Sequence, residues 1–507
     1  MALGTALTSC QWNVGTIDVY LAYNAVPEKN PLKNVDKLKM RIEGPDMMPR
    51  EKEFAISSKA GSIGNIPPGK DRILSVEGID RSGRIRSRGV STPFEVEEGR
   101  KEIYLFFSNK GEFSPPPSVS GSGWKANYTT EMRNYKNIKG RAFSAVQALP
   151  NGLLLITGGA DPAVLDFLSP LGANSVIPTA ELFDPTSGAF VSSVKRGECD
   201  EQGQALCMQE PRVFHTAGYV NDLERILVIG GEPITSPYSE IFDPVDFIFT
   251  PGPAPNIPRS RHVAGKLPGK GGSLVIAGGR NEVNQVLDSI EIFDSNEQSF
   301  VGGPPLGVAR RGSRSVSTGN GVVVTGGFGD DGDATPTRQV DLIRANGDGS
   351  VSVDTYSDCL RKPRAWHTAV VVEDKDEKQV IFICGGISGN GEPDNTCECL
   401  DPETMKSEMA PENVKLFYAR WGHTATVLPD QKVLVAGGFS TSTGSAVLQN
   451  AVLLDPVGGE YNLGVLPMNA ARAGHSAALL TNGMVVLVGG VGQGGQPSTP
   501  DYEIYNP

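Results

Sequence analysis

The sequence predicts an all-β protein in which a small β-sandwich precedes seven copies of one β-unit. Three observations predict this fold class. Each of the 5 histidines stands three residues after an arginine. Each Arg-x-x-His segment leads into an apolar strand and then a β-branched strand that ends in Gly-Gly. Residues 15–110 instead show short alternating apolar runs parted by turn residues, which is typical of sandwich strands.

The repeat is defined by the spacing of arginine, histidine and the glycine pair. The pairs are Arg212/His215, Arg259/His262, Arg364/His367, Arg420/His423 and Arg472/His475. Two copies lack the histidine: Arg141 is followed at the same offset by Ser144, and Arg311 by Arg314. Gly-Gly pairs follow in phase at 158–159, 230–231, 278–279, 326–327, 385–386, 437–438 and 489–490. Seven units in register therefore predict a stacked repeat architecture.

After a variable loop, each unit continues into a third strand, as in Glu240-Ile241-Phe242-Asp243-Pro244. The whole pattern resembles the kelch repeat from Arg141 to the last residue. The resemblance implies four-stranded blades arranged as a seven-bladed β-propeller. The unit that begins at Arg472 ends after its third strand, so we expect residues 124–135 to supply its fourth strand and leave no open edge.

Arginine, glycine and glutamate are expected to meet at one rim of each blade. Arginine heads the first strand, Gly-Gly ends the antiparallel second strand, and glutamate heads the third. We interpret this arrangement as a partly buried ion pair, in which glycines leave room for the forked guanidinium. The predicted structural residues are Arg141, Arg212, Arg259, Arg311, Arg364, Arg472, Glu181, Glu240, Glu291, Glu398 and Glu503.

Unit six departs from this pattern because Val452 occupies the glutamate position. Arg420 is therefore expected to lack a carboxylate partner, and Trp421 follows it directly. Arg420, Trp421 and the nearby Trp366 are the candidate binding residues, although packing of the tryptophans between blades is the alternative. The histidines are expected to pack between blades, because one per blade around a ring does not form a metal site.

Domain boundaries follow from composition. Residues 15–112 are expected to form the sandwich, which resembles the Ig-like or prealbumin-like modules found before propellers in bacterial surface proteins. Residues 113–123, rich in Pro, Gly and Ser, are expected to form a linker, and residues 124–507 the propeller. Residues 1–14 resemble a truncated signal with a bacterial lipobox, in which Cys10 would be lipidated; a chance match is the alternative.

The 7 cysteines suit an oxidising compartment. Cys199 and Cys207 enclose a polar insertion and are expected to close a small loop by a disulfide. The pairing of Cys359, Cys384, Cys397 and Cys399 is left open, with free buried thiols as the alternative.

Charge and hydropathy restrict the partners. The net charge of −12 and the lack of a basic run argue against nucleic acid. No apolar stretch long enough for a transmembrane helix occurs, so a membrane would be contacted only through a lipid anchor. We expect a monomer.

The ring after a sandwich also resembles the central domain of galactose-oxidase-like copper enzymes. That family needs two axial histidines and a tyrosine crosslinked to cysteine, whereas every histidine here belongs to the repeat. No metal, cofactor or catalytic residue is predicted. We expect a non-catalytic cell-envelope or secreted protein that binds a protein or polysaccharide through the loops between second and third strands. The alternative is a secreted carbohydrate-active enzyme, either a sugar oxidase or a sialic-acid-type isomerase.

Overall fold

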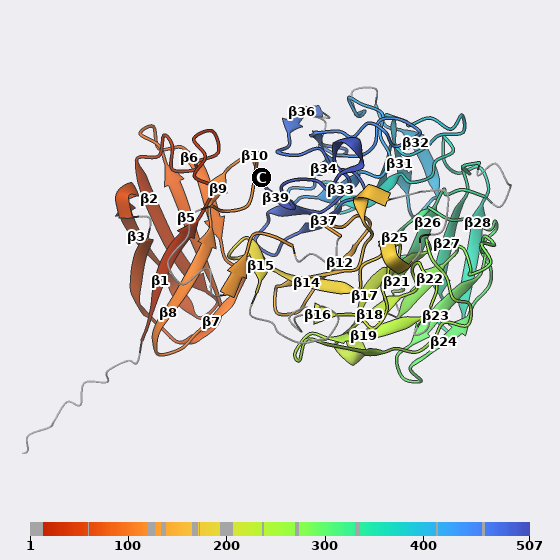
Figure 1. Ribbon diagram of the computed structural model, residues 1–507, viewed down its shortest axis with the longest axis horizontal. Helices are drawn as coiled ribbons and strands as arrows, with labels where there is room; N and C mark the ends of the chain where they lie inside the picture. Colours follow the sequence, from red (N-terminus) through yellow and green to blue (C-terminus); the bar gives the residue numbers. More distant parts are fainter. Residues whose placement is uncertain are drawn as a thin grey trace, which may run out of the picture.

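The computed structural model describes residues 14–58, 60–118, 127–132, 138–164, 171, 173–192, 206–235, 238–268, 273–329, 335–411, 414–458 and 462–507. Within these ranges the regular structure consists of β-strands and a few single-turn 3₁₀ helices. Two bodies are visible in Figure 1: a small sandwich formed by the N-terminal residues and a larger ring of sheets.

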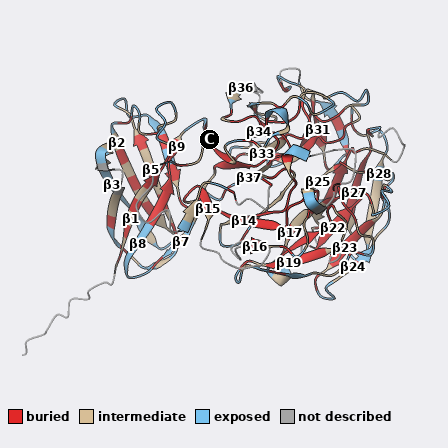
Figure 2. Ribbon diagram, in the orientation of Figure 1, coloured by how far each residue is buried: buried red, intermediate tan, exposed pale blue. Residues whose placement is uncertain are grey.

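Two sheets pack face to face in the N-terminal sandwich. The first has the order β4-β1-β8 and the second β3-β2-β5-β6-β9, with β7 paired to β5. Their bounds are β1 Gly15–Ala22, β2 Lys37–Gly44, β3 Met47–Ala55, β4 Ala60–Ile66, β5 Gly69–Ile79, β6 Ile85–Val90, β7 Phe94–Val96, β8 Gly99–Phe106 and β9 Ser108–Asn109. Alternate residues of β1, such as Ile17 and Val19, point into a core shared with Met40 and Val76. Figure 2 shows this core as buried and the outer strand β3 as exposed.

Seven antiparallel blades make up the larger body, which is a β-propeller; six have four strands, and blade one carries two short strands, β11 Tyr128–Thr129 and β16 Leu206–Cys207, in addition to its four. In the order first to fourth strand, blade one contains β12 Ala145–Ala148, β13 Leu154–Thr157, β14 Thr179–Asp184 and β15 Ala189–Val191. Blade two contains β17 Thr216–Val220, β18 Arg225–Ile229, β19 Ser239–Asp243 and β20 Ile248–Pro251. Blade three contains β21 Val263–Lys266, β22 Leu274–Ala277, β23 Ile290–Asp294 and β24 Ser299–Gly302.

The remaining blades repeat the same topology. Blade four contains β25 Arg314–Thr318, β26 Gly321–Thr325, β27 Val340–Ala345 and β28 Val351–Tyr356. Blade five contains β29 Thr368–Glu373, β30 Gln379–Cys384, β31 Cys397–Asp401 and β32 Lys406–Met409. Blade six contains β33 Thr424–Val427, β34 Val433–Ala436, β35 Asn450–Leu454 and β36 Asn462–Pro467. Blade seven contains β37 Ser476–Leu479, β38 Val485–Val488 and β39 Tyr502–Asn506, and it takes its fourth strand from elsewhere in the chain.

The seven first strands line the axis, and each contacts the first strands of the two neighbouring blades, so that the ring is closed. The second strands are buried on both faces, as the uninterrupted burial of Leu154–Thr157 and Val485–Val488 shows. A strand that is covered on both sides is expected to be a continuous β-branched and aliphatic run. Apolar clusters between consecutive blades therefore replace a single central core.

The strand that closes blade seven is not the one expected from the sequence. β10, Glu112–Ser114, pairs antiparallel with β39, whereas β11, Tyr128–Thr129, lies at the outer edge of blade one against β15. The described part of the expected segment, residues 127–132, thus does not close the last blade, and the segment assigned to the end of the sandwich and the start of a linker does. Phe113 explains the choice, because its buried ring packs 5.1 Å from the ring of Tyr505.

The sandwich docks on blades one and seven, at the place where the ring closes. The amide of Asn506 donates to the carbonyls of Arg88 and Ser108 at 3.1 and 3.2 Å. Asn482 spans the same boundary and donates to Val90 O and Pro185 O, both at 3.0 Å. Because these donors satisfy backbone carbonyls on both sides, the sandwich is held against the ring rather than linked to it flexibly.

Replacing Phe113 with alanine should lower the free energy of unfolding by about 3–5 kcal/mol, because a buried aromatic ring at the ring closure is lost. Urea unfolding, followed by tryptophan fluorescence, measures this change. Glu112→Ala is the matched control, since Glu112 is exposed on the same strand, and it should change the free energy by less than about 0.5 kcal/mol. Equal effects of the two substitutions would contradict the assignment of β10 as the closing strand.

Candidate functional site

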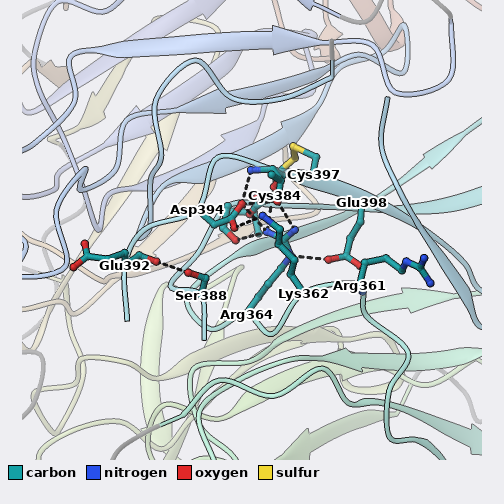
Figure 3. Close-up of polar contacts among 12 residues, drawn as sticks. Arg361, Lys362, Arg364, Cys384, Ser388, Glu392, Asp394, Cys397 and Glu398 are labelled. Carbon is teal, nitrogen blue, oxygen red and sulfur yellow. Dashed lines mark hydrogen bonds and ion pairs between the residues drawn. A yellow bond between two sulfur atoms is a disulfide. The ribbon is translucent and has the colours of Figure 1, made fainter. Parts of the chain in front are cut away.

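Each repeat arginine spans the rim of its own blade. In blade five, Arg364 donates from Nη1 to Gly385 O at 2.9 Å and Thr396 O at 3.1 Å, and from Nε to Glu398 Oε1 at 2.7 Å. Figure 3 shows Arg364, Asp394 and Glu398 grouped beside the Cys384–Cys397 disulfide. The side chain of Arg364 is completely buried. Burial of this cation is therefore balanced by a carboxylate and by backbone acceptors.

Equivalent acid–arginine pairs occur in six blades. They are Arg141–Glu181 at 3.5 Å, Arg212–Glu240 at 3.0 Å, Arg259–Glu291 at 2.6 Å, Arg364–Glu398 at 2.7 Å, Arg472–Glu503 at 2.9 Å, and Arg310–Asp341. The acid lies at the head of the third strand in every case.

The first glycine of each pair gives room to the backbone of the next blade, and a Cβ on the second would lie within 3.3 Å of the repeat arginine's Cβ in blades one, two, six and seven. Both glycines have positive φ, as in Gly385 at 63° and Gly386 at 93°. A Cβ on Gly385 would lie 2.7 Å from Arg420 O of the next blade. The N–H of Gly386 donates to that same carbonyl at 2.8 Å. Glycine is needed here because the neighbouring backbone comes too close for a side chain.

Blade four requires a correction, because its repeat arginine is Arg310 and not Arg311. Arg310 donates to Gln339 O at 3.0 Å, and its own carbonyl accepts from the N–H of Gly279 at 2.8 Å. Ser313 thus takes the place of the histidine, and Arg314 begins the first strand. The sequence misled because two arginines are adjacent and no histidine sets the register.

Arg420 is not a free cation, which corrects the binding site expected in blade six. Its side chain is completely buried, and it donates to Gly437 O at 2.8 Å and to Asn450 Oδ1 at 2.8 Å. The amide oxygen of Asn450 takes the role that the carboxylate has in the other blades. Burial lowers the pKa of Arg420 to about 10, so it remains charged at neutral pH.

The two candidate tryptophans are buried in an apolar cluster at the axis. Trp421 is 3% exposed, its ring lies 4.5 Å from that of Phe439, and its indole N–H donates to Thr441 O at 2.8 Å. Trp366 lies 6.0 Å from Phe143 and 5.9 Å from Phe214. Both tryptophans belong to one cluster, formed by residues that precede the first strands, residues that follow the Gly-Gly pairs and residues of the loops after them. Their main role is packing across the axis.

The histidines connect neighbouring blades. Each Nε2 lies at hydrogen-bond distance from a threonine hydroxyl of the preceding blade: His215 to Thr157, His262 to Thr216, His367 to Thr325 and His475 to Thr424 at 2.8 Å, and His423 to Thr368 at 3.0 Å. Burial, together with nearby arginines, lowers the pKa of His215 to about 3. The other four histidine pKa values are lowered for the same reason. All five are therefore neutral at pH 7.

Charged residues gather on one side of the axial mouth, the end of the axis where the first strands begin. The carboxylate of Glu232 accepts from Arg261 Nε and from Arg280 Nη2, both at 2.7 Å. It also accepts from the backbone N–H of Leu171 at 3.1 Å. Burial opposes ionisation of Glu232, but the two arginines outweigh burial and lower its pKa. This carboxylate is therefore charged and serves two guanidinium groups at once.

Arg311 is a third guanidinium at the same place. Its Cζ lies 5.4 Å from the centre of the Phe328 ring, and within the described ranges it makes no ion pair. Burial and the charges of Arg261 and Arg280 lower the pKa of Arg311 to about 10, so it stays protonated. Three cations beside one carboxylate leave this part of the mouth positive, although the protein carries a net charge of −12.

A pocket of about 150 Å³ opens beside this cluster. Glu232, Arg280, Asn284 and Ile234 contribute to its wall. Arg280 reaches Asn284 Oδ1 at 2.7 Å with the guanidinium nitrogen that does not contact Glu232. Sequence reasoning missed the pocket, although a signal was present. Glu232 and Arg280 each directly follow a Gly-Gly pair, where blades five, six and seven carry the apolar Ile387, Phe439 and Val491.

The cysteines divide into bonded and free. Cys384 and Cys397 face each other across β30 and β31 and form a disulfide with a Cα–Cα distance of 4.2 Å. Cys359 and Cys399 are free thiols. Cys207 is disulfide-bonded, while Cys199, its expected partner, lies outside the described residues, as does Cys10.

Among the described residues, His, Cys, Asp and Glu form no group of three suited to hold a metal ion. In the same part of the chain, no helix is long and apolar enough to cross a bilayer.

Removing the acid from one buried pair should destabilise the ring strongly. Glu398→Ala removes the carboxylate 2.7 Å from Arg364 and leaves only the more distant Asp394 at 3.6 Å, so the free energy of unfolding should fall by about 3–5 kcal/mol. Asn450→Ala removes only a neutral partner of Arg420 and should cost less, about 1–3 kcal/mol. Chemical denaturation measures both, with the exposed Glu373→Ala in the same blade as control. If Glu398→Ala matched the control, the ion pair would have no structural role.

Acidification should unfold the ring through its histidines. Because the histidine pKa values are lower in the folded state, the folded protein binds fewer protons than the unfolded protein at mildly acidic pH. The stability that is present above pH 6.5 is therefore lost as the pH falls toward the pKa values of the folded state. Each neutral histidine should contribute about 1.4 kcal/mol of lost stability per pH unit below about pH 6.5. Urea unfolding between pH 7.5 and 5 tests this slope. His215→Gln, which keeps a group able to reach Thr157, should reduce the slope by one histidine's share, and an unchanged slope would contradict a buried neutral His215.

Comparisons with known proteins give matches to solved structures only. No family model matches the chain, and no curated protein matches it. Solved structures do match. One of them, described as "Structure of YjhT", has 14% sequence identity and a TM-score of 0.44, and the match covers 64% of this chain and 97% of that chain.

Proposed function

We propose that this protein is a non-catalytic binding protein of the cell envelope, or a secreted one, and that it recognises an acidic polysaccharide through the face that carries the axial mouth. The loops between the second and third strands surround this face, and loops held on a rigid ring are suited to recognition. The observation that carries the proposal is the cluster of Arg261, Arg280 and Arg311 around the single carboxylate of Glu232.

The chemistry of the mouth favours a ligand with both an apolar face and a carboxylate. Blades three and four supply the guanidinium groups, and blades one and four supply the partly buried rings of Phe143 and Phe328. Arginine forks bind carboxylates in a bidentate manner, while aromatic rings pack against the C–H face of a sugar. The pocket of about 150 Å³ suits a single acidic sugar unit rather than a folded protein surface. A protein partner on the surrounding loops is the second candidate.

The proposal also includes the type of repeat and the compartment in which the protein acts. We assign the ring to the kelch type on its Arg, Gly-Gly and Glu pattern, and the sandwich to the Ig-like or prealbumin-like modules. The Cys384–Cys397 disulfide supports an oxidising compartment. Lipidation at Cys10 would then anchor a monomer to a bacterial membrane surface.

An enzyme on the same ring, such as a sugar oxidase or an isomerase, is less well supported. Glu232 lines the pocket, but two arginines hold it ionised, which disfavours a role as general acid. The five histidines are neutral and engaged between blades. Copper ligation would require breaking these contacts.

Binding of uronic-acid-containing polysaccharides, compared with neutral ones of similar length, tests the proposal. Arg311→Gln and Arg280→Gln should each weaken binding by about tenfold to a hundredfold, because each removes a charge-assisted contact. Arg344→Gln is the control, since Arg344 is a more exposed arginine paired with Asp354. Isothermal titration calorimetry gives the affinities. Equal affinity for neutral polysaccharides, or binding that both variants retain in full, would overturn the proposal.

A further inference from the structure

A second pocket lies on the propeller axis behind the aromatic residues of the mouth. Its volume is about 210 Å³, and its wall combines Phe143, Phe214 and Trp366 with the polar residues Ser144, Thr216 and Arg314. Arg261, Ser313 and three of the repeat histidines complete its polar lining. The residues that line it include two arginines and no aspartate or glutamate. The pocket is therefore positively charged, and it lies in the narrow centre of the ring.

Arg314 is the cation without a counter-charge. Its Nε donates to His367 O at 2.9 Å, and within the described residues it makes no ion pair. Burial alone lowers the pKa of Arg314, with no carboxylate contributing. Arg261 differs, because Glu232 lies 2.7 Å from its Nε. Arg314 is partly buried, and a partly buried guanidinium without an anion is costly, since no opposite charge compensates for the water that it loses.

The other groups around the pocket supply donors but no negative charge. The pKa values of the three histidines that line the pocket, His215, His262 and His475, are lowered by burial and by the charges of repeat arginines, so these side chains are neutral. Hydroxyl groups of Ser144, Ser313 and Thr216 line the same space. A cation, neutral imidazoles and hydroxyl donors form a typical environment for an anion.

The repeat itself shows that Arg314 is exceptional. The residue that begins the first strand is threonine in blades two, five and six, namely Thr216, Thr368 and Thr424. Each of these threonines lies at hydrogen-bond distance from the histidine of the next blade. Arg314 and Ser313 replace this threonine–histidine pattern in blade four. Because the ring architecture does not require an arginine at this position, we infer that Arg314 serves to bind a ligand.

We propose that the axial pocket binds a small monovalent anion, a halide or the carboxylate of a small acid, with Arg314 as its principal ligand. The hydroxyl groups of Ser144, Ser313 and Thr216 would complete the coordination. Because these residues come from blades one, two and four, the anion would link blades across the axis. A pocket of 210 Å³ has room for such an ion and ordered water. The site adjoins the proposed polysaccharide site, because Arg261 belongs to both, whereas Arg314 lines the axial pocket and Arg280 and Arg311 do not.

Thermal unfolding in matched sodium salts tests this proposal. Fluoride, which holds its hydration shell tightly, is the reference, and chloride, bromide and acetate are the test anions. For a ring of this size, the Tm of the wild-type protein should rise by about 1–2 °C for each tenfold increase in test anion above its Kd. Response to chloride and bromide but not acetate identifies a halide; response to acetate alone identifies a carboxylate.

Arg314→Thr is the informative variant, because it installs the residue that three other blades carry at this position. The substitution should abolish the anion-dependent rise in Tm. In fluoride, the Tm of the variant should lie above that of the wild type, because the unpaired guanidinium destabilises the wild-type ring. Arg344→Thr, on the same blade, should retain the wild-type response. The proposal is overturned if all three proteins respond equally to the test anions, or if no anion shifts the wild-type Tm relative to fluoride.

Diffraction from crystals grown in bromide gives a direct readout that does not depend on any variant. An anomalous peak beside the Arg314 guanidinium, absent from Arg314→Thr crystals, would establish the halide site. If acetate alone raises the Tm, the same position should hold acetate instead of bromide. An axial pocket that contains only water in crystals grown from both anions would rule the site out.

Discussion

The hydrogen bond from the second glycine of each Gly-Gly pair to the carbonyl of the next blade's arginine is the contact on which the ring depends. It occurs seven times, with N···O distances between 2.7 and 3.0 Å, and the last joins Gly490 to Arg141 across the closure. The approach is so close that no Cβ fits at the first glycine. The backbone carbonyl of each repeat arginine thus accepts a hydrogen bond from the preceding blade, while its guanidinium binds within its own blade. A single residue type therefore holds both the blade and the joint between blades.

The same contact explains why the axis is rich in buried polar groups. Holding the arginine in place brings the histidine three residues later against the preceding blade, where it meets a threonine hydroxyl. The arginine charge then depresses the histidine pKa further. These histidines are structural because their Nε2 atoms are engaged and their charge is suppressed. Chemistry at the axis must come from residues that depart from the repeat.

Departures from the repeat gather in blades two to four. Glu232, Arg261, Arg280, Arg311 and Arg314 all occupy positions where other blades carry apolar residues, glycine, threonine or serine. They create one charged cluster at the mouth and one unpaired cation behind it. Aromatic residues of the axial cluster come from blades one, two, four, five and six. A ring with nearly identical blades thus acquires a directional site through a few substitutions at its axis.

The sequence by itself determined the all-β class, the number of repeat units and the acid that faces most of the repeat arginines, because these follow from a local pattern repeated in register. Tertiary structure decided what depends on contacts between distant segments. It selected Glu112–Ser114 as the closing strand, since Phe113 finds a buried place against Tyr505. It also assigned Arg310 to the repeat and supplied Arg420 with Asn450. Neither spacing nor composition shows which arginine donates to an acceptor in another strand. An arginine that does so is structural, whereas one that does not is available to a ligand.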